Sequence, residues 1–246
     1  MQQILFRLPE LHTGLQRNPA VFQLMNTERW YHTIPFFLNM RVCVYCASSS
    51  RIDQVYFDAT RRLGKLLVDE GVSVVFGGGG AGLMGCLADT VLHHNGEIQG
   101  IMPEFMNDVE WAHKGVKNFV FTKTMAQRKA KFLEDIDGLI ALPGGSGTLE
   151  ELLEAITLKR LGKFLKPIVI LNLNGFYDPL KAMLERCVEK NFMHTKHLDM
   201  WTFVDQPEQV MEALHAAPSW NENAIHLTSS LAFPTRTAVV SEEEGA

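Results

Sequence analysis

From residue 41 onward the sequence alternates short apolar, β-branched runs with longer amphipathic stretches. Strands that alternate with helices form a parallel sheet covered by helices on both faces. The sequence therefore predicts an α/β fold, a Rossmann-like doubly wound parallel sheet with helices on both faces. Strands are predicted at 41–47, 73–76, 97–102, 119–122, 138–142 and 167–171, and helices at 54–70 and 83–95 and from residues 125, 149 and 177 onward.

The same alternation predicts one folded domain at 41–218. The chain has 246 residues, of which 46% are hydrophobic, which is sufficient for one core of this kind. The segment 1–40 does not follow the alternation and is predicted to be an N-terminal extension. The segment 219–246 is polar and ends in Ser-Glu-Glu-Glu-Gly-Ala, so a flexible C-terminal tail is predicted there.

The charge, the apolar runs and the cysteines of the sequence indicate which partners and which cellular location to expect for the chain. The formal net charge is −5 and the pI is about 6.0, which argues against a nucleic-acid-binding surface. No apolar run approaches the ~20 residues of a membrane span, and no secretory signal pattern begins the sequence. The chain is therefore expected to be a cytoplasmic protein without a membrane or nucleic-acid partner. Cys43 and Cys46 lie three apart in a predicted strand and should face opposite sides, so no metal site is expected from them.

Two glycine-rich segments each follow a predicted strand and lead into a helix. The first is 77–85 and the second is 143–147. Glycines let the backbone approach a ligand closely, and N–H groups at a helix N-terminus bind anions. If the two strands are near neighbours, both helix N-termini converge on one phosphate-bearing ligand. A tight turn would also explain the first segment, and its Gly80-x-Gly82-x-x-Gly85 pattern, with Glu104 about twenty residues downstream, also fits a dinucleotide site.

Two adjacent cations occupy the predicted inward face of the helix that begins near residue 125. Met125 and Phe132 belong to an apolar stripe whose intervening positions are Arg128 and Lys129. Burial of an unpaired charge is strongly unfavourable, so these side chains need carboxylates, a phosphate, or both. The structural alternatives are that they reach solvent from the helix start, or that they form a salt bridge with Glu151.

The helix predicted from residue 149 begins with two glutamates, Glu150 and Glu151. Thr148-x-x-Glu151 has the spacing of a capping box, which would give Glu151 a purely structural role. The functional interpretation is glycosidic chemistry, because a carboxylate beside a bound sugar phosphate can stabilise an oxocarbenium-like transition state or activate a water.

Together, Met125-x-x-Arg128-Lys129 and Pro143-Gly144-Gly145-x-Gly147-Thr148-x-x-Glu151 resemble the LOG family of cytokinin riboside 5′-monophosphate phosphoribohydrolases, over roughly residues 41–217. The resemblance implies a Rossmann-like fold, a homodimer with sites near its interface, no cofactor or metal, and AMP among the substrates. It implies catalytic roles for Arg128 and Glu151. The implied substrate-binding residues are Ser48, Gly80, Gly82, Met84, Gly85, Glu110, Lys129, Gly144, Gly145, Ser146, Gly147, Thr148, Glu150 and Thr157.

We therefore expect a hydrolase that cleaves the N-glycosidic bond of a nucleoside 5′-monophosphate into free base and ribose 5-phosphate. Glu104 follows Met102-Pro103 where many members of this family have lysine, which bears on the preferred base. A non-catalytic module that binds a nucleotide or the molybdenum cofactor is the main alternative, and a nicotinamide-dependent oxidoreductase is a third. The lysine decarboxylase label that such sequences often carry requires a Schiff-base lysine, and Lys129 beside Arg128 lacks that context.

Overall fold

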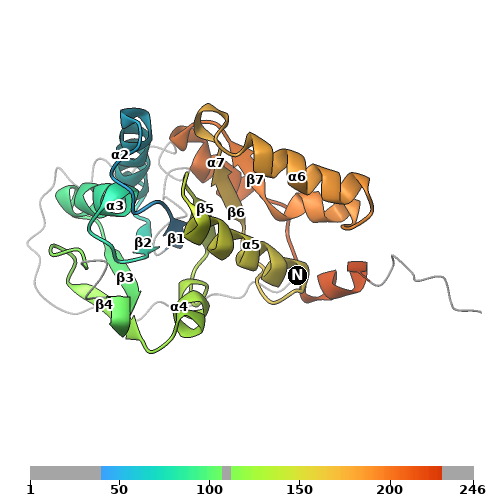
Figure 1. Ribbon diagram of the computed structural model, residues 1–246, viewed down its shortest axis with the longest axis horizontal. Helices are drawn as coiled ribbons and strands as arrows, with labels where there is room; N and C mark the ends of the chain where they lie inside the picture. The colour runs from blue at the N-terminus through green and yellow to red at the C-terminus, as the bar shows by residue number, and fades with distance from the viewer. Residues whose placement is uncertain (1–39, 107–111, 229–246) are drawn as a thin grey trace, which may run out of the picture. The chain divides into compact units, whose positions relative to one another are not determined.

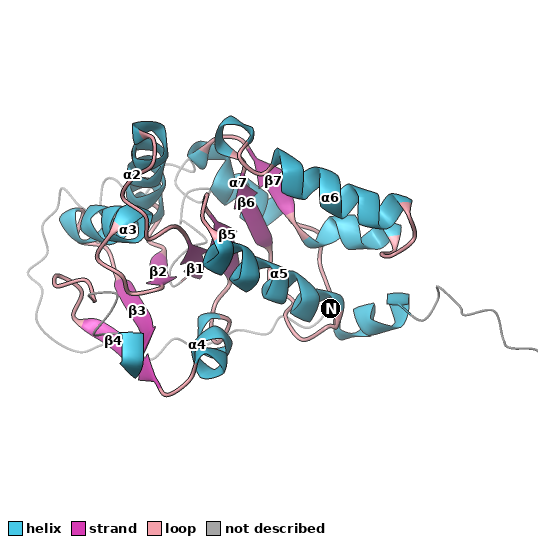
Figure 2. Ribbon diagram, viewed as in Figure 1, coloured by secondary structure: helices cyan, strands magenta, loops and turns pink. Residues whose placement is uncertain are grey.

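The computed structural model describes residues 40–106 and 112–228. In these residues, strands and helices alternate along the chain (Figures 1 and 2). The elements are β1 (Arg41–Tyr45), α2 (Gln54–Asp69), β2 (Ser73–Phe76), α3 (Gly82–His93), β3 (Ile98–Pro103), η2 (Glu104–Met106), β4 (Asn118–Thr122), α4 (Met125–Phe132), β5 (Gly138–Ala141), α5 (Ser146–Arg160), β6 (Ile168–Leu171), η3 (Leu173–Gly175), α6 (Asp178–Glu189), η4 (Thr195–Met200), β7 (Thr202–Val204), η5 (Pro207–Gln209), α7 (Val210–Ala216) and η6 (Glu222–Thr228).

The strands form one parallel sheet in the order β4-β3-β2-β1-β5-β6-β7. The chain builds outward from β1 to β4 and then returns to the other side of β1 to begin β5. In the register of this central pair, Val42 lies beside Gly138 and Tyr45 beside Ala141. The predicted doubly wound α/β fold is confirmed. The reversal of strand order makes the carboxyl ends of β1 and β5 the expected place for a ligand.

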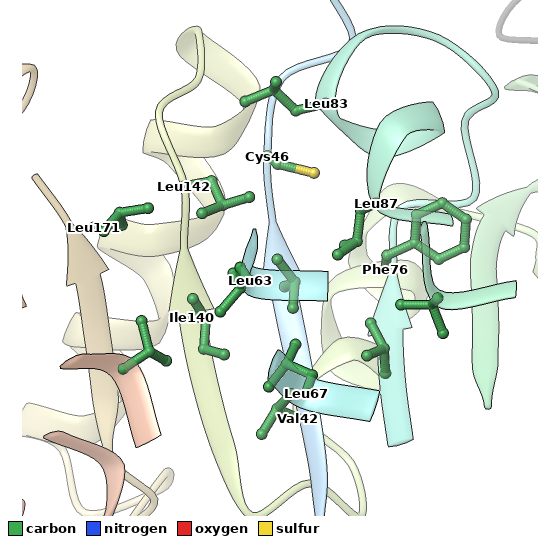
Figure 3. Packing of buried hydrophobic residues seen from close by; sticks show 14 of the residues in the cluster. Val42, Cys46, Leu63, Leu67, Phe76, Leu83, Leu87, Ile140, Leu142 and Leu171 are labelled. Carbon is green, nitrogen blue, oxygen red and sulfur yellow. The ribbon is translucent and has the colours of Figure 1, made fainter. Parts of the chain in front are cut away.

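Alternation along β1 divides the core into two layers. Val42, Val44 and Cys46 pack with α2, α3 and α7, and part of this layer is drawn in Figure 3. Cys43 and Tyr45 pack on the other face, with side chains from α4, α5 and α6. Side chains of successive strand residues point to opposite faces, so this division follows from the sequence. The prediction that Cys43 and Cys46 face opposite sides is confirmed.

Helix α5 begins three residues before the predicted position. Gly145 is its N-cap residue and Ser146 its first residue, whereas the sequence suggested a start at Leu149. Glycine and serine are weak helix formers, so the pattern placed the start too late. Strand β7 and helix α7 were not predicted, because Thr202–Val204 is only three residues long.

Residues 219–228, the described part of the predicted C-terminal tail, contact the end of α5. The Trp220 indole N–H donates to the Lys159 carbonyl at 2.7 Å, at the end of α5, and Ala224 in η6 is buried. Gly162 has φ +67° and lies so close to the Glu222 backbone that a side chain would collide with it. The predicted extension, apart from Met40, and residues 229–246 lie outside the described residues.

Candidate active site

A cavity of about 330 Å³ opens at the carboxyl ends of β1 and β5. Its lining comes from the loop after β1, the start of α5, and side chains of α4 and the β2–α3 segment. This is the position expected for a ligand in a sheet of this topology. The residues that line it are Val44, Tyr45, Cys46, Ala47, Ser48, Ser49, Gly77, Met84, Met106, Met125, Arg128, Gly145, Ser146, Gly147, Thr148, Glu150 and Glu151.

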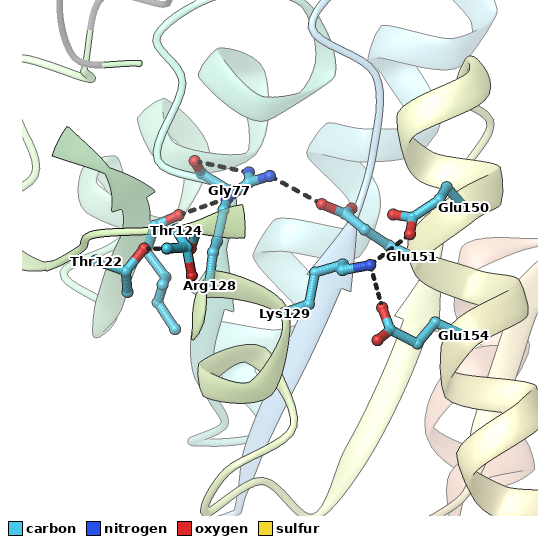
Figure 4. Close-up of polar contacts among 9 residues, drawn as sticks. Gly77, Thr122, Thr124, Arg128, Lys129, Glu150, Glu151 and Glu154 are labelled. Atoms are coloured by element: carbon cyan, nitrogen blue, oxygen red, sulfur yellow. Dashed lines mark hydrogen bonds and ion pairs between the residues drawn. The ribbon is translucent and has the colours of Figure 1, made fainter. Parts of the chain in front are cut away.

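An ion pair between Arg128 of α4 and Glu151 of α5 borders this cavity (Figure 4). The Arg128 Nη1 donates to Glu151 Oε1 at 3.0 Å, and the two side chains are 7% and 12% exposed. The remaining contacts of Arg128 fix its guanidinium. Nε donates to the Ile101 carbonyl at 3.1 Å, and Nη2 donates to the Gly77 carbonyl at 3.3 Å.

The position of the Arg128 guanidinium is set by the capped start of α4 and by two neighbouring residues, Phe132 and Gly77. Thr124 caps α4 by accepting from the Gln127 N–H, which fixes the first turn of the helix. Phe132 lies one turn after Arg128, and the guanidinium carbon lies 4.7 Å from the centre of its ring. A Cβ at Gly77 would lie 2.8 Å from Arg128 Nη2, so glycine at this position gives the guanidinium its space. The sequence reasoning did not select Gly77 as a site residue.

Lys129 takes the outer side of the same helix. It pairs with Glu150 and with Glu154, the latter at 2.8 Å (Figure 4). Hydrogen bonds that Lys129 donates to these two carboxylates raise its pKa above the ordinary value. The sequence required carboxylates or a phosphate near the two cations, and the structure provides carboxylates for both. The predicted salt bridge between Arg128 and Glu151 is present.

The predicted capping box is wrong. Thr148 lies inside α5, because the helix already begins at Ser146, and Gly145 has no side chain with which to cap it. The Glu151 carboxylate instead reaches Arg128 across the cavity wall. A structural role for Glu151 through the Thr148 N–H is therefore excluded by the position of the helix start.

The start of α5 leaves room for a ligand. A Cβ at Gly145 or Gly147 would meet no atom within 4 Å, so packing does not require glycine at either position. Gly144 differs, because a Cβ there would lie 2.1 Å from Thr148 Oγ1. The exposed residues Gly145–Gly147 line the cavity, and the first N–H groups of a helix have no partner inside it. This helix N-terminus can therefore bind an anion.

The start of α3 does not offer the same group of donors, which contradicts the expected convergence of two free helix N-termini. The Gly82 N–H donates to Ser50 Oγ, and the Leu83 and Met84 N–H groups donate to the Ala47 carbonyl. Gly82 has φ +61° and would collide with the Ser48 backbone if it carried a side chain. Gly85 packs in the same way against the Gly80 carbonyl. Neither Gly82 nor Gly85 lines the cavity beside Arg128.

A second cavity of about 770 Å³ adjoins the first through two shared residues, Ser48 and Met84. Gly80 lines this second cavity only, together with His113, whose Nε2 lies 3.0 Å from Asp89 Oδ1. Thr157 lies on the exposed side of α5, where its hydroxyl donates to the Leu153 carbonyl, and it lines neither cavity. Glu110 lies outside the described residues.

Among residues 40–106 and 112–228, no three His, Cys, Asp or Glu side chains are grouped to hold a metal ion. No helix in the described part of the chain is long and apolar enough to cross a bilayer.

Residues 84–214 match the family model described as "Possible lysine decarboxylase". A cytokinin riboside 5′-monophosphate phosphoribohydrolase of Arabidopsis thaliana is 35% identical over 185 residues, which cover 75% of this chain and 81% of that protein. Another from the same plant is 40% identical over 153 residues, covering 62% and 72%.

A solved structure shares the fold at much lower identity. The molybdenum cofactor carrier protein of Chlamydomonas reinhardtii superposes with a TM-score of 0.56 and 16% identity, covering 72% of this chain and 96% of that one. At this identity the likeness concerns the fold alone. The relatives with much higher identity carry the name of a phosphoribohydrolase.

Proposed function

Because the chain belongs to the LOG family of cytokinin riboside 5′-monophosphate phosphoribohydrolases, we propose that it hydrolyses the N-glycosidic bond of nucleoside 5′-monophosphates. AMP and cytokinin riboside monophosphates are the proposed substrates, and free base and ribose 5-phosphate the products. The observation that carries the proposal is the Arg128–Glu151 pair, which borders the same cavity as the open N-terminus of α5.

The 5′-phosphate binds at the start of α5. The N–H groups of Ser146, Gly147 and Thr148 supply donors, and the helix dipole adds positive potential. Open space at Gly145 and Gly147 lets phosphate oxygens approach the backbone. Glu151 lies five residues beyond Ser146, about 7.5 Å along a helix, so a ribose anchored by its phosphate can extend toward the carboxylate.

The reaction then breaks the C1′–N bond and forms a C1′–O bond. The electron pair of the C1′–N bond goes to the base, which takes up a proton, and positive charge develops on the ribose. Glu151 stabilises that charge and accepts a proton from the attacking water. The water oxygen becomes the C1′ hydroxyl of ribose 5-phosphate.

Arg128 serves as a positioning residue for Glu151. Two backbone carbonyls and the Phe132 ring hold its guanidinium, which in turn holds the carboxylate at 3.0 Å. Its positive charge compensates Glu151 in a partly buried place, where an unpaired carboxylate would be unfavourable. This division of labour assigns the chemistry to Glu151 and the geometry to Arg128.

The alternative functions fit these contacts less well. A Schiff-base lysine must lose its proton, whereas Glu150 and Glu154 hold Lys129 in its charged form and raise its pKa. A dinucleotide site would use the start of α3, but the N–H groups there already donate hydrogen bonds to the loop after β1. These are the N–H groups of Gly82, Leu83 and Met84. A pure binding module gives no reason for the Arg128–Glu151 pair in the cavity wall.

The finer proposals are a homodimer and a cytoplasmic location. Exposed apolar side chains occur on η2, β4 and α4, where Phe105, Phe121 and Met125 are 56%, 46% and 36% exposed. A second copy that covers them would bring the subunit interface close to the cavity, since Met125 also lines it. The four cysteines are free thiols, which is typical of a reducing compartment.

The test compares release of free base from AMP and from adenosine, and it compares turnover of the Glu151→Gln variant with that of a variant at a nearby carboxylate. Wild-type protein should release adenine from AMP and not from adenosine, measured by chromatography of the free base. Glu151→Gln should lower turnover by about 100-fold or more with AMP binding retained. Glu154→Gln is the matched control, because Glu154 also pairs with Lys129, lines neither cavity, and should keep turnover near wild type. Equal rates on AMP and adenosine, or an active Glu151→Gln protein, would contradict the proposal.

A further inference from the structure

Tyr45 is a buried tyrosine at the edge of the candidate active site, and neither the motifs nor the proposed chemistry uses it. It ends β1 and is 3% exposed. Its side chain lies on the sheet face that carries α4 and α5, the helices of Arg128 and Glu151. The ring packs edge-on against Phe132, with centroids 5.5 Å apart, and the Arg128 guanidinium lies over that same Phe132 ring.

The Tyr45 hydroxyl has no hydrogen-bond partner among the residues that the structure describes. It is also absent from the small group of unpartnered polar atoms that are sealed from solvent. Because Tyr45 lines the 330 Å³ cavity, the hydroxyl opens onto that space. Buried polar groups almost always have a partner, so a ligand group is the natural one here.

Burial and the nearby negative charge keep the Tyr45 phenol protonated, so it can donate a hydrogen bond. Burial raises the pKa of Tyr45 well above its ordinary value, and the nearby carboxylate of Glu151 raises it further. The geometry places the phenol on the side of the Arg128–Glu151 pair, because the Phe132 ring contacts both Tyr45 and the Arg128 guanidinium. A neutral O–H at that end suits a neutral acceptor such as a sugar hydroxyl.

We propose that the Tyr45 hydroxyl is a specificity-determining group that hydrogen-bonds to the ribose 2′-hydroxyl of the bound nucleotide. The inference rests on the proposed function, which orients the substrate with its phosphate at Ser146–Thr148 and C1′ at Glu151. The 2′-hydroxyl is the sugar hydroxyl adjacent to C1′, so it is the one that the Glu151 end of the cavity receives. A site that hydrogen-bonds a substrate hydroxyl discriminates against the analogue that lacks it.

The experiment compares AMP with 2′-deoxyAMP in wild type and Tyr45→Phe. The two nucleotides are scored by kcat/KM, and by Kd in the Glu151→Gln background, where turnover is slow. Wild type should prefer AMP by about 10-fold or more, a factor typical of one hydrogen bond. Tyr45→Phe should lose that preference by weakening AMP alone, while 2′-deoxyAMP keeps its wild-type value.

Tyr177→Phe is the matched control. Tyr177 is equally buried, but its hydroxyl donates to the Leu142 carbonyl at 2.7 Å and lines neither cavity. This variant should lower the melting temperature and leave the preference for AMP over 2′-deoxyAMP intact. Tyr45→Phe should show the reverse pattern, because its hydroxyl has no partner in the protein to lose.

The outcomes separate this inference from the proposed function. A Tyr45→Phe protein that keeps the wild-type preference, or a wild type without any preference, overturns the role of Tyr45. A wild type that binds AMP more tightly than 2′-deoxyAMP through Tyr45 but releases no adenine overturns the hydrolysis and supports the role of Tyr45.

Discussion

Gly147→Ala should raise stability and lower nucleotide affinity, two effects that seldom occur together. Gly147 is the second residue of α5, and a Cβ built there meets no atom within 4 Å. Alanine is better than glycine in a helix by roughly 0.5–1 kcal/mol. For a domain of about 150–250 residues, each kcal/mol changes the melting temperature by about 2–4 °C, so a rise of about 1–4 °C is expected.

The affinity should change in the opposite direction. Gly147 lines the cavity, and the added methyl group would occupy space through which a phosphate oxygen approaches the first N–H groups of α5. We expect the Kd for AMP to rise about 10-fold or more, since loss of one or two charged hydrogen bonds has at least that cost. Isothermal titration in the Glu151→Gln background measures it, and scanning calorimetry measures the melting temperature.

Gly144→Ala is the control for this prediction. Its Cβ would lie 2.1 Å from Thr148 Oγ1, so this variant should lose stability before any ligand is added. If Gly147→Ala binds AMP as tightly as wild type, phosphate does not bind at the open start of α5 and the orientation proposed for the substrate is wrong.

Two further predictions concern the buried Lys159 of α5 and the exposed side chains of Phe105 and Phe121. Burial lowers the pKa of Lys159 from 10.5 to about 8, so between these pH values the unfolded chain binds more protons and the free energy of unfolding should rise with pH. Lys159→Met should abolish that rise in denaturant titrations from pH 7 to 10.5, and should add at most about 3 kcal/mol to the free energy of unfolding below pH 8. An unchanged slope would show that another group causes it. Phe105→Asp combined with Phe121→Asp should convert the proposed dimer to a monomer in sedimentation experiments, and the doubly substituted chain remaining a dimer would place the interface elsewhere.

The sequence predicted which segments form strands, but it did not predict the order of those strands in the sheet. Short apolar, β-branched runs identified six of the strands, because strands of a parallel sheet are buried on both faces, as Val42 and Cys43 are. The pairing of β1 with β5 depends on packing between segments almost a hundred residues apart, which local pattern does not encode. Position after a strand was nevertheless enough to select Arg128 and the segment Gly144–Thr148.

The sequence failed where weak helix formers and single contacts decide the structure. Gly-Ser-Gly at 145–147 reads as a loop, yet the helix begins there, and that shift removes the capping box that was the structural alternative for Glu151. The polar composition after residue 218 reads as a tail, yet Trp220 and Glu222 contact the end of α5 through an indole N–H and the close approach of Gly162. Tyr45 carried no motif, and only its position at the carboxyl end of a central strand could have indicated it.

The Arg128–Glu151 pair is better explained by positioning than by stability. A buried ion pair contributes little net stability, because desolvation of both charges offsets their attraction. Removal of Arg128 would take away the cation that pairs with a largely buried Glu151, so an inactive Arg128 variant would not distinguish a catalytic arginine from a structural one. Glu151→Gln keeps the size of the side chain and leaves the arginine bound to the Ile101 and Gly77 carbonyls. That substitution changes the charge facing the cavity with the least change to the wall around it, so its turnover reports on the chemistry itself.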